Sequence, residues 1–320
     1  MNNSVKEVFV CSAARSGSTL LDMLLGQHPK IESLGEINFL GKSIARNEQC
    51  SCGELVRKCP AWIDVFSEIK REKGIDLLAH PYGMRQWDTR MDNANADFNQ
   101  QTKLYLLARL LRRASTRLHY VHALYKLLPL PPKLEKGIQN AFYMYDLIRN
   151  LRSVDTVVDS SKDVYKAVSI YLRAPESVRL IFLSRDGRGV MYSRLYSGVR
   201  TEESPSHAIR QWRKYYAQSL SLIERWVDKR HVKYLRYEDL VASPDQVMED
   251  VFQWLGLESN EFPLTQSNKT LHIAGGNDGT KARFGNGVKL DERWKHGLSS
   301  SELELFDRLA GSLNRTLGYQ

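Results

Sequence analysis

The sequence lacks several features typical of membrane and repeat proteins. No charge-free apolar stretch approaches the ~18 residues that a membrane-spanning helix requires, so we expect no transmembrane segment. Residues 1–4 show no basic-then-apolar signal pattern, which predicts a cytoplasmic protein. Internal repeats and low-complexity tracts are also absent. We therefore expect one globular domain over residues 1–320.

Cysteine is scarce, with four among 320 residues. One lies in an apolar segment, and three fall in the motif CSCGELVRKCPAW: Cys50, Cys52 and Cys59. A structural zinc site takes four ligands, and this motif offers three, with His80 a distant candidate for the fourth. A disulfide is a second alternative, although cytoplasmic proteins normally keep thiols reduced. We expect the third alternative, a tight turn packed on Trp62, and no metal ligands.

Acidic residues are outnumbered, with 46 Lys and Arg against 37 Asp and Glu and a formal net charge of +9. Such an excess suits nucleotides, polyanionic sugars, anionic membranes or nucleic acid. No aromatic-and-basic RNA signature or helix-turn-helix spacing is present, so we expect no nucleic-acid partner. The longest helix candidate, residues 97–128, carries leucines at helical spacing among basic residues. It could pack on the domain, contact a membrane surface or bind an acceptor.

Apolar segments alternate with amphipathic ones along most of the chain. The apolar segments predict strands at residues 5–14, 31–34, 155–158, 179–184 and 231–237. Between and after them, helical patterns cover residues 18–27, 163–173, 187–196, 206–229, 245–255 and 300–316. This alternation predicts an α/β fold with a doubly wound parallel sheet flanked by helices. Residues 65–150 depart from the alternation and predict a helical insertion over the sheet.

The stretch VFVCSAARSGSTLLDMLLGQHP outlines a P-loop-like turn between a strand and a helix. Gly17 permits close backbone approach, and the N–H groups of residues 17–20 would face a phosphate at the helix N-terminus. Arg15 adds a planar fork that can hold two oxygens. Triphosphatase loops place lysine directly after the glycine, where this chain has Ser18. The loop therefore predicts an anion site and disfavours ATP-dependent phosphoryl transfer with Mg²⁺.

Groups suited to binding anions or moving protons follow four of the predicted strands. They are Arg15 to Thr19, Glu36, Asp159 to Lys162, and Ser184 to Asp186. Ligands of open parallel sheets bind in the crevice beyond the carboxyl ends of the strands. We therefore expect these groups to meet in one pocket.

These segments resemble the sulfotransferases that use 3′-phosphoadenosine 5′-phosphosulfate (PAPS). SAARSGSTLL is similar to their 5′-phosphosulfate loop, and FLSRDGRGVMYSRL is similar to their 3′-phosphate motif. HPKIESLGEINFL and VVDSSKDVYK resemble segments of the tyrosylprotein and bacterial carbohydrate-type branch, in which a glutamate is the base. The resemblance covers residues 8–60 and 155–295.

The resemblance implies that PAPS is the sulfuryl donor and adenosine 3′,5′-bisphosphate (PAP) the product, with no metal required. It implies the following donor-binding residues: Arg15, Ser16, Gly17, Ser18, Thr19, Leu20, Arg185, Ser193, Tyr237 and, in the irregular loop GGNDGTKARFG, Arg283 in preference to Lys281. Glu36 would be the catalytic base, while Arg15 and Lys162 would hold the transferred group.

The resemblance leaves the acceptor open. Carbohydrate, lipid, peptide tyrosine and small metabolite all remain open, and we expect a hydroxyl or amine of a carbohydrate, lipid or small metabolite, with residues 65–150 capping its site. Most cytosolic members carry lysine in place of Arg15 and use a histidine base that has no equivalent here. His80, His119 and His122 lie in the insertion and are expected on the surface or in packing. Two alternatives remain: a P-loop kinase or triphosphatase using ATP and Mg²⁺, and a non-enzymatic basic adaptor that binds an anion.

Overall fold

The computed structural model describes residues 4–87, 132–196, 204–258, 269–282, 284 and 289–320. Within them, five parallel strands form one sheet in the order β2-β3-β1-β4-β5. The strands are β1 (Glu7–Ser12), β2 (Ile31–Ser33), β3 (Thr156–Asp159), β4 (Val178–Ser184) and β5 (Val232–Arg236). From β1 the chain goes first to β2 and β3, on one side of β1, and then crosses to β4 and β5 on the other side. The predicted doubly wound α/β fold is confirmed.

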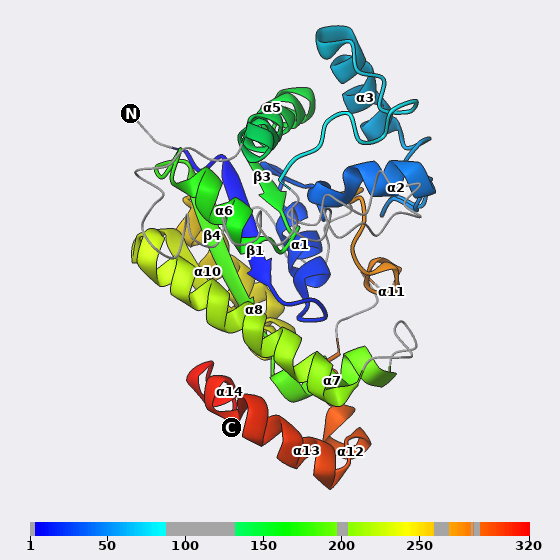
Figure 1. Cartoon of the computed structure of the whole chain (residues 1–320). Helices are drawn as coiled ribbons and strands as arrows, with labels where there is room; N and C mark the ends of the chain where they lie inside the picture. Colours follow the sequence, from blue (N-terminus) through cyan, green and yellow to red (C-terminus); the bar gives the residue numbers. More distant parts are fainter. Residues whose placement is uncertain (1–3, 88–131, 197–203, 259–268, 283, 285–288) are drawn as a thin grey trace.

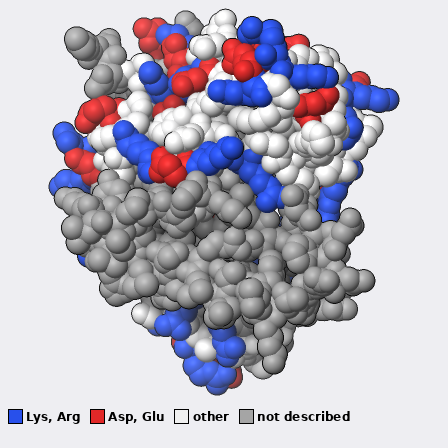
Figure 2. Space-filling model, turned by 45° about the horizontal axis from the view of Figure 1, so that its top comes forward, with Lys and Arg blue, Asp and Glu red and all other residues white. Residues whose placement is uncertain are grey.

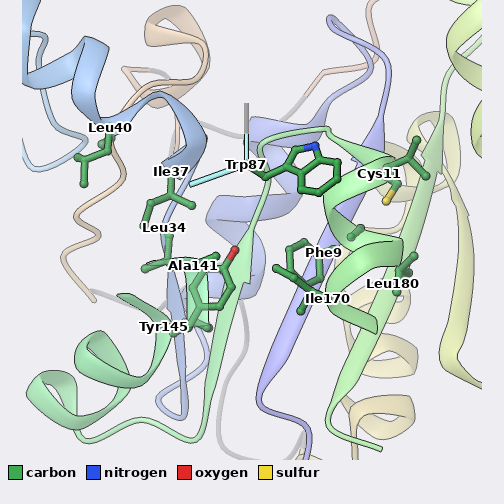
Figure 3. Close-up of a cluster of buried hydrophobic side chains, with 14 of the residues drawn as sticks. Phe9, Cys11, Leu34, Ile37, Leu40, Trp87, Ala141, Tyr145, Ile170 and Leu180 are labelled. Carbon is green, nitrogen blue, oxygen red and sulfur yellow. The ribbon is translucent and has the colours of Figure 1, made fainter. Parts of the chain in front are cut away.

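Strand β1 lies at the centre of the sheet, between β3 and β4. Phe9 is opposite Asp159 in β3 and Leu180 in β4. Alternate residues of a strand face opposite sides, and both sides of β1 are buried. The Phe9 side contributes to a core with Trp87 and Tyr145 (Figure 3). Burial on both faces explains why β1 reads as a continuous apolar run in the sequence.

Helices cover both faces of the sheet (Figure 1). One face is packed by α1 (Ser18–Gly26), α9 (Tyr237–Ala242) and α10 (Pro244–Leu255). The other is packed by α5 (Pro132–Arg152), α6 (Val164–Tyr171) and α8 (Pro205–Trp226). In Figure 1, α6 and α8 lie in front of the sheet and α10 lies behind it. This arrangement leaves the carboxyl ends of the strands, rather than the faces of the sheet, as the place for a ligand.

The region expected to be an insertion contains a helix of the central core. Helix α3 (Pro60–Lys73) packs against α5, and α5 packs against β2 and β3. Met144 and Tyr145 of α5 are completely buried. The end of residues 65–150 is therefore part of the main domain. The predicted helix 97–128, with His119 and His122, lies outside the described residues, and the capping role stays a prediction.

The remaining elements surround the sheet edge and the C-terminus. They are η1 (Ile37–Phe39), α2 (Leu40–Arg46), α7 (Gly187–Tyr196), η4 (Lys229–His231), α11 (Asp278–Lys281), α12 (Trp294–Gly297), α13 (Ser300–Phe306), the π-helical segment η5 (Asp307–Gly311) and α14 (Ser312–Thr316). The helix expected at 300–316 thus contains a π-helical segment. Among the described helices, none has the length and apolarity needed to cross a bilayer.

Basic and acidic side chains are mixed over the upper described part of the face in Figure 2. Figure 2 shows Lys and Arg side chains interleaved with Asp and Glu over the described part of one face. In this view the described basic residues of the upper part do not form one uninterrupted basic surface. The groups at the strand ends are better candidates for recognising a specific anion.

Candidate active site

The loop between β1 and α1 has an unusual backbone that brings its amides to the helix start. Arg15 and Gly17 have φ values of 71° and 88°, in the left-handed region. Gly17 occupies the N-cap position of α1, so no side chain caps the helix there. A Cβ atom on Gly17 would lie 2.3 Å from Cδ2 of Tyr237. Only glycine fits, and the first N–H groups of α1 are left to an anion.

Arg185 links this loop to the end of β4. Its Nη1 donates to the carbonyl oxygen of Arg15 at 3.0 Å, and its guanidinium lies 4.5 Å from the ring centroid of Tyr237. Nη2 also contacts Oδ2 of Asp291 at 3.3 Å. The pKa of Asp291 is lowered to about 2, chiefly by hydrogen bonding to Arg293. The nearby Arg185 charge also lowers it, and together these effects outweigh burial. The predicted residues Arg15, Gly17, Arg185 and Tyr237 therefore meet in one place.

Ser193 lies on the helix that follows Arg185, and it is buried. It comes four residues after Gly189, where a Cβ atom would lie 3.3 Å from Nε of Arg185. Residues four apart share a helix face, so Ser193 belongs to the side of α7 that faces Arg185. Arg283 lies outside the described residues. Lys281 donates to the carbonyl oxygen of Gln49 at 3.1 Å and is held by that structural contact.

Glu36 and Lys162 form an ion pair at the ends of β2 and β3. Their side chains are 24% and 15% exposed, respectively. Lys162 has a φ of 64°, and the N–H of Glu36 donates to the carbonyl oxygen of Ala274 at 3.2 Å. Both side chains line a cleft of about 920 Å³ that also reaches Ser12 to Ala14. The predicted base Glu36 and the cation Lys162 thus lie together, in a cleft that includes the start of the loop between β1 and α1.

A buried network that sequence reasoning missed supports this pair. Oδ2 of Asp159 lies 2.5 Å from the Tyr145 hydroxyl and 2.6 Å from Nζ of Lys166. Lys166 also donates to Asn38 and Gln86, each at 2.6 Å, and it is 1% exposed. Since Asn38 follows Glu36 and Lys166 follows Lys162, the network fixes both segments of the ion pair. A single lysine within the apolar helix VYKAVSIY was the available signal.

Ionisation within this network is set by two opposing effects. Burial lowers the pKa of Lys166, while the Asp159 carboxylate opposes that change. Burial opposes ionisation of Asp159, but the Lys166 ammonium and the hydrogen bonds outweigh it and lower the pKa of this carboxyl. The two groups therefore stabilise each other in their charged forms. Removing either would leave a buried charge without its partner.

Helix α8 supports the other side of the site through Trp212 and Tyr216. The Tyr216 hydroxyl lies 2.9 Å from Oγ of Ser16 and 2.9 Å from the carbonyl oxygen of Leu183. Nε1 of Trp212 donates to the carbonyl oxygen of Arg185 at 3.3 Å. Burial raises the pKa of Tyr216, so its hydroxyl remains neutral. The sequence placed both aromatics on a helix but carried no signal for these contacts.

A buried carboxyl group lies beneath the first loop. Asp22, in α1, is completely buried. Burial, together with the nearby Asp159 carboxylate, raises the pKa of Asp22 well above its usual range. The fold therefore favours the neutral form of Asp22, which has no assigned role in the chemistry of the site.

Comparison with known proteins bears on the family and the fold of the chain. The model of the sulfotransferase family matches residues 7–261. Among solved structures, the sulfotransferase domain from the curacin biosynthetic pathway aligns with a TM-score of 0.52 and 19% identity, covering 99% of this chain and 98% of that one. At this identity the likeness supports the fold and nothing finer.

Two further solved structures are similar at lower scores. Sulfotransferase STF9 from Mycobacterium avium has a TM-score of 0.47 and 14% identity, with 99% of this chain and 78% of that chain covered. The sulfotransferase domain of the Synechococcus PCC 7002 olefin synthase has a TM-score of 0.43 and 17% identity, with 99% and 96% covered. These scores add no argument of their own. No curated protein sequence matches the chain. The family match over residues 7–261, on a parallel α/β sheet, shows that the chain belongs to the sulfotransferase family.

Proposed function

We propose that the protein transfers a sulfuryl group from PAPS to a hydroxyl group of an acceptor and releases PAP. The observation that carries the proposal is the meeting of two sets of residues at one sheet edge. One set is the glycine loop with Arg185, which suits an anionic nucleotide. The other is the Glu36–Lys162 pair at the adjoining cleft, which suits proton removal beside a developing negative charge.

The donor would be held at both of its anionic ends. The amides of residues 17–20 and the side chain of Arg15 suit the 5′-phosphosulfate, because Gly17, the N-cap of α1, leaves the first N–H groups of the helix without a side-chain cap. Arg185 and Ser193 suit the 3′-phosphate. Tyr237 lies between Gly17 and Arg185 and would border the nucleoside.

The donor supplies a sulfuryl group whose bond to the 5′-phosphate oxygen breaks as the acceptor oxygen attacks sulfur. In this scheme Glu36 accepts the proton of the attacking hydroxyl. Lys162 and Arg15 stabilise the negative charge that develops on the sulfuryl and bridging oxygens, and this role needs no metal. Since Glu36 and Lys162 are paired, Lys162 would have to turn toward the transferred group when the donor binds.

The cleft beside Glu36 suits the hydroxyl-bearing end of a small molecule, carbohydrate or lipid. Its volume of about 920 Å³ falls within the ~300–1,000 Å³ typical of small-molecule sites. Its lining combines apolar side chains with basic ones, for example Leu40, Leu77, Met84, Lys42 and Arg46. Such a lining favours an acceptor with both an apolar part and polar or anionic groups. Membership of the sulfotransferase family disfavours the kinase and adaptor alternatives.

Transfer of radiolabelled sulfate from PAPS to a panel of carbohydrate, lipid and metabolite acceptors tests the proposal. The Glu36→Gln variant should reduce turnover by roughly 10²–10⁴-fold while PAP affinity is preserved. Glu68 of α3 gives a matched control, because its side chain is 25% exposed and paired with a cation, Arg71, and Glu68→Gln should have normal turnover. Near-normal turnover of Glu36→Gln would remove this carboxylate from the mechanism.

A thermal-shift comparison tests the donor separately from the acceptor. PAP at ~100 times its dissociation constant should stabilise the protein by about 2.7 kcal/mol. ATP with Mg²⁺ should stabilise it much less, because lysine is missing after Gly17. Stabilisation by ATP and Mg²⁺ alone would contradict PAPS as the donor.

A further inference from the structure

Three cysteines and a histidine meet at one point outside the proposed active site. Within the described residues, Cys50, Cys52, Cys59 and His272 each place one ligand atom within 4.8 Å of the others. The sulfur atoms of Cys52 and Cys59 are 3.7 Å apart, and Sγ of Cys59 is 3.3 Å from Nδ1 of His272. Around a tetrahedral zinc ion, sulfur ligands lie about 3.8 Å apart and a sulfur–nitrogen pair about 3.5 Å apart.

We propose that these four residues bind one zinc ion in a closed, structural Cys₃His site. The four protein ligands complete a tetrahedron and leave no position for water, which distinguishes a structural from a catalytic zinc. The proposal departs from the sequence expectation of a turn without metal ligands. It also corrects the candidate for the fourth ligand, since His80 is exposed and lies outside the group whereas His272 completes it.

The backbone brings the three thiols to one point. The N–H of Cys50 donates to the carbonyl oxygen of Glu54 at 2.8 Å, which closes a tight turn around Gly53, whose φ is 94°. Cys59 is the N-cap of the 14-residue helix α3. The first turn of this helix therefore fixes the position of the third sulfur.

Hydrogen bonds on both sides of His272 hold it against this turn. Oγ of Ser51 donates to the carbonyl oxygen of Leu271 at 2.6 Å and accepts from the N–H of Ile273 at 2.8 Å. The N–H of Ser51 donates to the carbonyl oxygen of Ile273 at 3.2 Å. Thus Ser51, between two of the cysteines, is bonded to both neighbours of the histidine. The fold itself brings the fourth ligand to the other three.

The zinc would fasten a segment that continues into the candidate active site. Two residues after His272, Ala274 accepts a hydrogen bond from the N–H of Glu36 at 3.2 Å. Further on, the N–H of Asn277 donates to Oγ1 of Thr19 at 3.1 Å. Cys59 and His272 are 213 residues apart, so the metal cross-links distant parts of the chain and stabilises them by closing a long loop. Its role is to position the segment that contacts Glu36 and Thr19.

Metal analysis of the full chain tests the proposal. The protein is expressed with added zinc and purified under reducing conditions without chelator, and metals and free thiols are then measured. We expect about one zinc per chain, as a single four-ligand site requires. Cys59→Ser and His272→Ala should lose the zinc, whereas His272→Cys, which keeps four ligands, should retain it.

Matched controls keep the result independent of folding defects. His80→Ala and Cys11→Ala should keep their zinc, because neither residue belongs to the cluster. On the wild-type chain, Co²⁺ replacement should give the visible absorption of tetrahedral cobalt thiolate. Zinc removal by a chelator should lower the melting temperature by at least about 5 °C. It should also speed amide exchange at residues 274–277 roughly tenfold or more.

Four outcomes would overturn the proposal. They are a chain with four free thiols and no zinc, iron in place of zinc, a disulfide between Cys52 and Cys59 found by mass spectrometry, and zinc retained in His272→Ala but lost in His80→Ala. The disulfide is the sharpest rival, because the two sulfur atoms are only 3.7 Å apart. Zinc and an intact disulfide cannot share these sulfurs, so one measurement decides between them.

Discussion

The two ends of the candidate site are held by different kinds of contact. Around Arg185, the loop is fixed by close packing, since the Tyr237 ring leaves no room for a side chain at Gly17 and the guanidinium lies over the same ring. Around Glu36, the side chains are fixed by charge, through the Glu36–Lys162 pair and the buried Asp159–Lys166 pair. The first end combines close packing with the Arg185–Asp291 ion pair, and the second depends on ionisation alone. Substitutions should therefore have different consequences at the two ends.

This difference suits the chemistry proposed for each end. A nucleotide with several fixed negative charges is recognised best by a rigid set of donors, because little reorganisation is needed on binding. A base must instead give up its ion-pair partner and take a proton during each turnover. Close packing at the Arg185 end suits rigid binding of the nucleotide, and the ion pair at the Glu36 end suits a base that must change its partner. Both lie at the carboxyl ends of the strands.

The largest expected effect is at the ionic end. Lys166→Met should destabilise the protein by about 3–5 kcal/mol, because Asp159 would be left as a buried charge without its cation. Lys162→Met, which removes a partly exposed cation, should cost less than half as much stability but should lower turnover. Denaturant unfolding of both variants measures the difference. Equal stability losses would show that the two ion pairs are not distinct in role.

The second-largest effect is expected on PAP affinity at the contact between Gly17 and Tyr237. Gly17→Ala should weaken PAP binding by at least about 100-fold, because the left-handed backbone is strained and the new Cβ meets the Tyr237 ring. Gly74 has a φ of 67° and open space around it, so Gly74→Ala introduces the strain without the clash. This control should bind PAP normally. Equal PAP affinity of Gly17→Ala and wild type, by calorimetry, would mean that the contact between loop and ring is dispensable.

A pH experiment examines the buried carboxyl group of Asp22, whose electrostatic neighbours include Asp159, Lys162 and Glu36. The pKa of Asp22 is higher in the folded state than in the unfolded state. Below the unfolded-state pKa both states are protonated and Asp22 does not lower the stability. As pH rises from there through the folded-state pKa, the unfolded state ionises more readily and the stability falls. Asp22→Asn should therefore stabilise the protein relative to wild type, and more at pH 8 than at pH 5. Melting temperatures at the two pH values test this. A gain that is larger at the lower pH would contradict the neutral state of Asp22.

The smallest effect is expected on PAP affinity at Asp291, the ion-pair partner of Arg185. Asp291→Asn should raise PAP affinity by roughly 2–5-fold, since the partly exposed carboxylate competes with a phosphate for the guanidinium. The gain should shrink at high salt. Asp307→Asn, which removes an exposed carboxylate paired with Arg315, should leave affinity unchanged and serves as the control. Weaker binding by Asp291→Asn would indicate that Asp291 orients Arg185 rather than competing for it.

The first strand and loop were predictable because their signals are local. The apolar run of β1, Gly17 and the helix after it lie within twenty neighbouring positions, and the structure places them as expected. The strand is shorter than predicted, ending at Ser12 rather than residue 14, because the loop already turns there. The predicted site residues Arg185, Tyr237, Glu36 and Lys162 also lie at the same sheet edge, as the rule for parallel sheets requires.

The contacts that support these residues were not predictable in the same way. Lys166 reaches Asn38, Tyr216 reaches Ser16, and His272 reaches Cys59, although each pair is distant in the sequence. A lysine in a helix or a histidine in a loop has the same local pattern whether it is solvated or buried. The sequence therefore offered only His80 as a distant candidate for a fourth ligand, whereas in the described structure His272 lies beside the three cysteines.

By itself, the sequence determined the elements, the glycine loop and the kinds of groups at the strand ends, because periodicity and turn chemistry depend on neighbouring residues. Only the tertiary structure decided that Glu36 pairs with Lys162, that Lys166 is buried against Asp159, and that His272 joins the cysteines. Those pairings depend on which segments the sheet order β2-β3-β1-β4-β5 brings together. Contacts between distant segments are a property of the packed chain, and local patterns do not encode them.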